Sequence, residues 1–161
     1  MQFYFYHNKE FQMKFEIPTS ARVVDSPEVM RTIANQLPAG SPICIVFDGN
    51  QEKMNVMTEN VLLRFEQDFY DIVELSLSNM PIFGVAVLKT DVYRSQGGFL
   101  VCSSLLGSQH LAYDSTVSWQ RYVYFNKLCL IFTTLNVSVP RNLSDADLRI
   151  DRTVNSLTFQ Q

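Results

Sequence analysis

The sequence predicts a β-rich α+β fold, an antiparallel-dominated sheet or sandwich of roughly eight or nine strands with two or three short helices. Short apolar runs rich in β-branched and aromatic residues recur along the chain, and in its second half they follow one another without helices between them. A doubly wound parallel sheet needs a helix between nearly all of its strands, so this pattern excludes that class. The chain has 161 residues, the length of one ordinary domain, and we expect residues 1–161 to form a single domain.

The central element of this prediction is a β-hairpin over residues 116–139. Two apolar runs meet at Asn126-Lys127, and a two-residue connection between such runs is typical of a tight hairpin turn. In the resulting register Phe125 lies opposite Leu128. The run from Leu128 to Phe132 has no polar alternation, so both of its faces need cover. We therefore expect this hairpin near the middle of a sheet.

Three elements are predicted in the N-terminal third of the chain. Residues 3–7 and 11–17 flank a polar loop, and the second run alternates apolar and polar residues, which indicates a hairpin with one solvated face. Ser26-Pro27 is typical of a helix start, because the hydroxyl caps free amides and proline suits the first helical position. The unbroken apolar run 43–47 predicts an interior strand that ends at Asp48.

The hydrophobic period changes along the middle of the chain. Apolar residues at helical spacing predict a helix from Thr58 to about Asp71, and alternation from Ile72 predicts a strand that ends near Asn79. The spacing of Ser144 and Asp147 suits a capping box and predicts a short helical turn. Further strands are expected at residues 82–88, 99–106 and 153–159.

Charge and composition narrow the classes of partner. The formal net charge is −3 and 18% of the residues are charged, so the chain lacks the basic excess that neutralises phosphates, which weighs against nucleic acid. The N-terminus lacks the pattern of a secretory signal, and the longest apolar run is far below the roughly 20 residues of a membrane helix. We therefore expect a cytoplasmic or other intracellular protein without a membrane partner. Its cysteines should be reduced and buried in strands, at Cys44, Cys102 and Cys129.

An acidic cluster is the sharpest candidate for chemistry. Asp48 follows a predicted interior strand, where open sheets place ligand-binding groups, and Asp145 and Asp147 lie in the predicted helical turn. If these carboxylates converge, they have the ligand type that holds Mg²⁺ or Mn²⁺ for phosphodiester hydrolysis. The Asp48-Gly49-Asn50 step resembles the strand-end aspartate of metal-dependent nucleases of the PIN type, which implies a metal ligand at Asp48. A turn at Asp48 and a helix cap at residues 144–147 explain the same residues without a metal.

Other catalytic patterns are missing from the sequence. It contains no Gly-x-Ser-x-Gly elbow, no Gly-x-x-x-x-Gly-Lys phosphate loop and no zinc-ligand spacing of histidines and cysteines. We therefore expect no cofactor and favour a non-enzymatic structural or interaction protein, with a metal-dependent nuclease that uses Asp48, Asp145 and Asp147 as the alternative.

We expect the protein to act through protein–protein contacts, with itself or with another protein. Its weakly charged surface and aromatic strands suggest that part of the surface is covered, so we expect a homo-oligomer. The composition would suit a component of a viral or phage particle. The favoured contact is the N-terminal hairpin, where Tyr4 and Tyr6 share one face of the first strand.

Overall fold

A computed structural model of the chain describes residues 2–34, 41–48, 52–59, 61–108, 116–135, 137–138 and 143–160. Over these residues the fold is α+β and strand-rich, with two antiparallel sheets and three short helices, as the sequence predicts. In chain order the elements are β1 (Phe3–Asn8), β2 (Met13–Pro18), β3 (Ala21–Val24), α1 (Pro27–Ala34), β4 (Ser41–Asp48), β5 (Glu52–Thr58), α2 (Glu66–Asn79), the 3-10 helix η1 (Met80–Phe83), β6 (Val85–Arg94), β7 (Leu100–Ser108), β8 (Thr116–Phe125), β9 (Leu128–Leu135), β10 (Val137–Ser138), α3 (Leu143–Asn155) and β11 (Thr158–Phe159).

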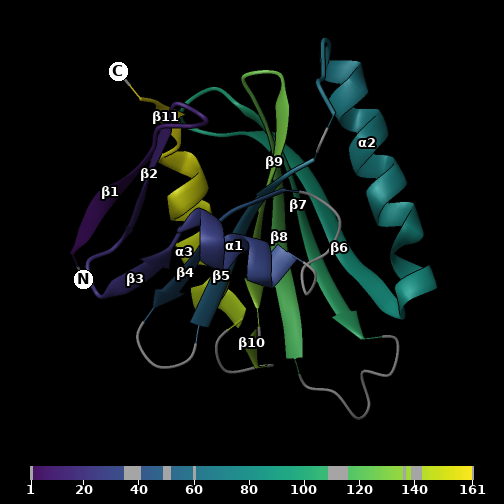
Figure 1. The fold of residues 1–161 in the computed structure, drawn as a ribbon. Helices are drawn as coiled ribbons and strands as arrows, with labels where there is room; N and C mark the ends of the chain where they lie inside the picture. Colours follow the sequence, from purple (N-terminus) through teal and green to yellow (C-terminus); the bar gives the residue numbers. More distant parts are fainter. Residues whose placement is uncertain are drawn as a thin grey trace.

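The strands of the described residues form one large and one small sheet. The large sheet has the order β3-β4-β5-β9-β8-β7-β6, with β10 paired to β8, and the small sheet has the order β1-β2-β11. Figure 1 shows the small sheet and α3 on one side of the molecule and α2 on the other. The free edges of the large sheet are therefore β3 and β6.

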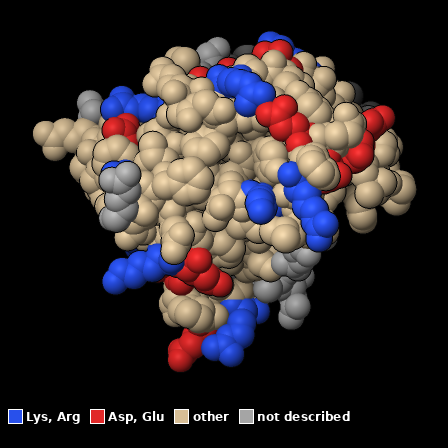
Figure 2. Space-filling view, turned by 90° about the horizontal axis from the view of Figure 1, so that it is seen from above, with Lys and Arg blue, Asp and Glu red and all other residues tan. Residues whose placement is uncertain are grey.

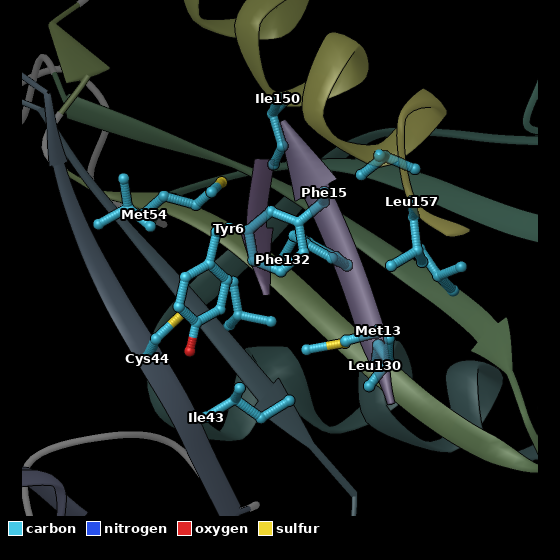
Figure 3. Close-up of a cluster of buried hydrophobic side chains, with 14 of the residues drawn as sticks. Tyr6, Met13, Phe15, Ile43, Cys44, Met54, Leu130, Phe132, Ile150 and Leu157 are labelled. Carbon is cyan, nitrogen blue, oxygen red and sulfur yellow. The ribbon is translucent and has the colours of Figure 1, made fainter. Parts of the chain in front are cut away.

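The first face of the large sheet packs against the small sheet and α3. Phe15 of β2 meets Phe132 of β9 edge to face, with 5.4 Å between the ring centroids, and Ile150 and Val154 of α3 join the same cluster. Figure 3 shows these side chains converging between β2, β9 and α3. All four residues are at most 1% exposed. Their cluster is the larger part of the hydrophobic core.

The second face of the large sheet packs against α2. Phe69 and Val73 of α2 are buried in a second cluster with Tyr122 of β8 and Ile131 of β9, and the Phe69 ring stacks on Tyr124 with 5.7 Å between centroids. Helix α1 packs against β4. Within the described residues, no helix is both long and apolar enough to span a membrane.

The predicted central hairpin is confirmed. Strands β8 and β9 pair with Phe125 opposite Leu128, and the turn residues Asn126 and Lys127 have φ values of 48° and 63°. Two successive left-handed residues define the tight turn whose twist matches that of the flanking strands. Strand β9 lies between β5 and β8, so the hairpin is interior to the sheet, and Phe132 is fully buried.

Two N-terminal predictions are also confirmed. Strands β1 and β2 form the expected hairpin, whose apolar residues Met13, Phe15 and Ile17 all have zero exposure. Helix α1 begins at Pro27, directly after Ser26. In the run 43–47, predicted as an interior strand, Phe47 is the exception, because it is only partly buried while the other four residues are buried.

The predictions for residues 58–79 are partly wrong. The expected helix is present only from Glu66, as α2 (Glu66–Asn79), which continues where a strand was expected from Ile72; Thr58, expected to start the helix, ends β5 (Glu52–Thr58), which pairs with β9. The helix begins where the Asp68 carboxylate accepts hydrogen bonds from the N–H groups of Arg64 and Phe65, at 3.1 and 3.0 Å. This side-chain cap satisfies free amides at the first turn, and Thr58 does not serve as one.

The strand predicted at residues 153–159 is present only at its end. Helix α3 continues to Asn155, and Thr158–Phe159 forms a strand, β11, on β2. Ile150 and Val154 of α3 and the following Leu157 are buried in the first core. Those apolar positions, four and three residues apart, match a helical face that reaches farther than the sequence pattern suggested.

Candidate interaction surface

The structure describes the side chain of one of the three predicted metal ligands, Asp147. Asp48 ends β4 and Asp145 lies in α3, but their side chains are outside the described residues. The Asp147 carboxylate forms an ion pair with the guanidinium group of Arg121, so its negative charge is already balanced by a positive one. Among the described residues, no group of three His, Cys, Asp or Glu side chains is placed to hold a metal ion. The nuclease alternative therefore gains no support at Asp147.

Arg121 is the centre of a polar network that holds α3 to the large sheet. Its side chain is 3% exposed, lies over the Trp119 ring with 5.1 Å to the centroid, and approaches Asp151 with 4.0 Å between Nε and Oδ1. The Tyr93 hydroxyl donates to Asp151 at 2.5 Å. Burial, followed by this bond, raises the pKa of Tyr93, so the phenol remains a donor. A buried cation neutralised by carboxylates of a neighbouring helix is a structural arrangement, and removing its partner would leave the charge uncompensated.

The two tyrosines predicted at an interface have different environments. Tyr6 is 7% exposed, its ring lies 5.2 Å from that of Phe15, and its hydroxyl donates to Asp25 at 3.0 Å. Tyr4 is 39% exposed. The Tyr6 ring is therefore covered by the chain's own core and the Tyr4 ring is partly exposed, and an interface at Tyr4 and Tyr6 stays a prediction.

Exposed apolar side chains gather where α2 is followed by η1 and β6. Ile82 and Phe83 are each 77% exposed, the highest values for large apolar side chains among the described residues. Gly84, at φ 74°, ends η1 and starts the chain into β6, and η1 packs against both α2 and β6. We call this the η1–β6 surface and define it by Leu75, Ile82, Phe83, Leu88 and Val92, all at least 43% exposed. Exposed apolar side chains mark an interaction site where they form a contiguous patch.

The η1–β6 surface borders the free edge of the large sheet. Strand β6 has ten residues, pairs with β7 on one side, and ends the strand order on the other. A β-bulge lies between Val87 and Lys89, and the N–H of Val92 donates to the Asp91 carboxylate at 3.0 Å. An edge strand presents backbone donors and acceptors that a further strand can pair with. Apolar side chains and an open strand edge thus coincide at one place.

Charged side chains do not form a basic patch on the face drawn in Figure 2. Uncharged surface fills the centre of this view, and among the residues drawn in colour the carboxylates gather toward the side on which α2 lies in Figure 1. Helix α2 carries Glu66, Asp68, Asp71 and Glu74 and no lysine or arginine. This part of the molecule offers no attraction for phosphate groups.

The fold is shared with proteins of very different sequence. No family model matches the chain, and no curated protein matches it. The solution structure of cyanobacterial PsbP (CyanoP) from Synechocystis sp. PCC 6803 superposes with a TM-score of 0.61 at 11% identity, over 98% of this chain and 92% of that one. The crystal structure of PA94 from Pseudomonas aeruginosa, a protein of unknown function, gives 0.52 at 15% identity, over 100% and 99%. The chain thus has a PsbP-like α+β fold, and the likeness establishes the fold alone.

Sequence reasoning missed the η1–β6 surface. Residues 82–88 were assigned to a strand, whereas β6 begins at Val85 and the preceding residues form η1. The available signal was the pair Pro81 and Gly84, which interrupts the apolar run and is typical of a turn. A turn in that place exposes the two apolar residues between them.

Proposed function

We propose that this protein is a non-enzymatic interaction protein that assembles through protein–protein contacts at the η1–β6 surface. The observation that carries the proposal is the near-complete exposure of Ile82 and Phe83 beside an open strand edge. A role in a viral or phage particle, in the cytoplasm or elsewhere inside a cell, stays a prediction from composition.

The energetics of exposed apolar groups support the proposal. Burying a side chain such as isoleucine or phenylalanine is worth about 1.5–3 kcal/mol relative to leaving it in water. In the single chain Ile82 and Phe83 obtain little of this, because 77% of each remains exposed. Covering both in a contact therefore supplies a substantial part of the free energy of association, and a monomer has no packing reason to hold them there.

The open edge adds specificity to this driving force. Apolar contacts are not directional, whereas backbone hydrogen bonds along β6 fix the orientation of a partner strand. The carboxylates and lysines near the edge then select among partners by charge. An interaction protein needs both an apolar driving force and directional recognition, and the residues for both lie within η1 and β6.

The test is sedimentation velocity of the full chain across the micromolar range. We expect the wild-type protein to sediment above the monomer. The double variant Ile82→Ser with Phe83→Ser should weaken association by about tenfold or more, since the two lost contacts together are worth at least the ~1.4 kcal/mol of a tenfold change. Neither side chain is needed for the fold of the single chain, because both are exposed, so the circular dichroism spectrum should remain that of the wild type.

A matched control lies at the other end of α2. Leu62 and Phe65 are 63% and 69% exposed, so Leu62→Ser with Phe65→Ser removes similar apolar surface from a different place. The control should leave association unchanged. A wild-type chain that stays monomeric throughout the concentration range, or a control that dissociates the assembly as strongly as the η1 variant, contradicts the proposal.

A further inference from the structure

The free edge of β6 is complementary to itself. We propose that a second copy of this chain pairs its β6 antiparallel with this edge, about a two-fold axis at Thr90, so that the two large sheets become one continuous sheet. This inference rests on the proposed function and names the partner and the register.

The side chains of β6 define this register. Lys89 lies opposite Leu105 and Asp91 opposite Ser103 on the neighbouring β7, so both charged side chains are on the same face of the sheet, and both are exposed. With the axis at Thr90, Lys89 of each copy lies opposite Asp91 of the other, and opposite charges directly across a strand pair are stabilising. The dimer forms this ion pair twice.

Apolar residues of the same strand are covered by the same pairing. Leu88 lies opposite Val92 of the second copy, and these side chains are 43% and 47% exposed in the single chain. Because the strands run in opposite directions, the start of one β6 meets the end of the other. Ile82 and Phe83, just before β6, are thereby brought to the turn that follows Arg94 of the second copy.

Two-fold symmetry leaves few other registers. When the two-fold axis is perpendicular to the sheet, the same face of each copy lies on the same side of the joined sheet. The axis must then lie at a residue of β6, so the possible registers differ by moving the axis one residue along the strand. An axis at Lys89 places two lysines opposite each other, and an axis at Asp91 places two aspartates opposite each other; like charges in this position are destabilising. An axis at Val92 leaves both charges without an opposite partner. The axis at Thr90 is the register that pairs them.

The backbone along β6 is oriented for the same pairing. The N–H of Val92 donates to the Asp91 carboxylate at 3.0 Å, and from this bond we infer that it faces the free edge and not β7. Every second residue shares this direction, which presents the N–H and C=O groups of Thr90 to the edge as well. At the axis the two copies of Thr90 exchange both backbone hydrogen bonds, and Asp91 moves from the Val92 N–H to Lys89 of the second copy.

The edge also carries features that exclude other strands. A lysine and a β-bulge, at Lys89 and beside Leu88, are common protection against edge-to-edge aggregation. Asp91 lies two positions after Lys89. It can neutralise the Lys89 charge of an approaching strand only if that strand is an antiparallel second copy with the axis at Thr90. The same residues thus disfavour foreign strands and admit a second copy.

A single cysteine at the axis tests the geometry. In this register the two Thr90 Cα atoms lie about 5.5 Å apart, within the range of a disulfide, whereas two Val92 residues are separated by four positions, or about 13 Å. Thr90→Cys should therefore form a covalent dimer under mild oxidation at least tenfold faster than Val92→Cys, a matched exposed position on the same strand. The native thiols Cys44, Cys102 and Cys129 are buried and do not compete.

Charge exchange tests the recognition without a covalent bond. Lys89→Asp and Asp91→Lys should each weaken the dimer by about tenfold in sedimentation equilibrium, because each converts two attractive pairs into two repulsive ones. The double variant Lys89→Asp with Asp91→Lys restores both pairs and should return to within about twofold of the wild type.

The outcomes separate this inference from the proposed function. Equal crosslinking at Val92→Cys, unchanged association of the single charge variants, or no recovery in the double variant overturns the register while wild-type association still supports the proposed function. A wild-type chain that is monomeric in the same experiment overturns both.

Discussion

The two faces of the large sheet are built differently. The first face is sealed by the small sheet and α3 around an apolar cluster that includes Phe15 and Phe132. The second face packs against α2, and beside that cluster it carries a row of buried polar residues. These residues are neighbours across four adjacent strands, β5, β9, β8 and β7: Asn55, Thr133, Gln120 and Ser104.

The two faces therefore differ in what they contribute to stability and to interaction with a partner. In each residue of the polar row, one buried oxygen has no hydrogen-bond partner among the described residues, and leaving such a group unpaired costs about 1–3 kcal/mol. We therefore expect the first face to contribute more to stability than the second, where these groups offset part of the hydrophobic gain. The η1–β6 surface adjoins the second face through α2 and the edge strand β6. A region that contributes less to folding is the one in which apolar surface is left for a partner.

The largest expected effect is at the centre of the first face. Phe132→Ala should lower the free energy of unfolding by about 3–5 kcal/mol, because Phe132 is fully buried against Phe15 and leaves a cavity when truncated. The measurement is urea or guanidinium denaturation, compared with Phe65→Ala as an exposed control, 69% exposed and outside the η1–β6 surface, that should stay within about 0.5 kcal/mol of the wild type. An unchanged denaturation midpoint for Phe132→Ala would show that the first face does not carry the stability.

Alkaline pH should destabilise the protein through both faces. Burial raises the pKa of Tyr6 and Cys44 on the first face and of Tyr122 and Cys129 on the second. In the unfolded chain thiols ionise near pH 8.5 and phenols near about pH 10, so the unfolded state loses these protons first and is favoured as pH rises. Stability should be complete below about pH 8.5 and fall above it by up to about 1.4 kcal/mol per pH unit for each group.

Denaturation curves at neutral and alkaline pH measure this loss. Tyr6→Phe and Tyr122→Phe each remove one ionising phenol, so each should flatten the alkaline limb of the stability profile by a similar amount. Stability that stays constant from pH 7 to about pH 10.5 would contradict the burial of these groups.

Two adjacent threonines give the most direct comparison of the faces. Thr134 points to the first face, where its hydroxyl accepts from the Trp119 N–H at 3.0 Å and donates to the Trp119 carbonyl at 3.3 Å. The hydroxyl of Thr133 points to the second face and has no partner among the described residues, and both residues are 8% exposed. Thr134→Val should cost about 1–3 kcal/mol, whereas Thr133→Val should be neutral or stabilise by about 1 kcal/mol.

The same denaturation experiment measures the free energy of unfolding of both threonine variants. Opposite signs for one substitution at neighbouring positions support the contrast between the faces. A loss at Thr133→Val as large as at Thr134→Val would mean that the hydroxyl on the second face is satisfied.

The smallest expected difference concerns the three thiols. All are buried, so they should react slowly with a thiol reagent in the native protein and rapidly after unfolding. Cys44 on β4 and Cys102 on β7 each lie one strand in from a free edge, β3 and β6, while Cys129 is on the central β9. Because sheet edges open locally before centres, Cys44 and Cys102 should be labelled before Cys129, by about tenfold. Labelling of Cys129 before Cys102, followed by mass spectrometry, would reverse this ranking.

The sequence by itself determined the elements whose information is local. The central hairpin needs only two apolar runs and the pair Asn126-Lys127, and its register was predicted to the residue. The N-terminal hairpin and the start of α1 at Pro27 also depend on neighbouring residues alone. In each case the turn or cap chemistry and the hydrophobic period agree, so the local sequence has one favourable conformation.

The tertiary structure decided the segments whose local pattern suits two conformations. Val73, Leu75 and Leu77 alternate as in a strand, yet Phe69, Val73 and Leu77 also recur at a spacing of four, as on one face of a helix. The helix prevails because the second face of the large sheet needs cover, which Phe69 and Val73 provide, while Leu75 is left 61% exposed. Residues 52–58 become a strand because β9 has an unpaired side that they complete.

Strand order also decided where the protein is open to a partner. Val92 and Val101 both lie in strands, but Val92 is 47% exposed on the edge strand and Val101 is fully buried one strand further in. The convergence of Arg121 with Asp147, 26 residues apart, likewise follows from the packing of α3 on β8. Whether such a residue belongs to the core, to an ion pair or to an open edge depends on which distant strands pair. A local period specifies the faces of a strand, and only the assembled sheet specifies its neighbours.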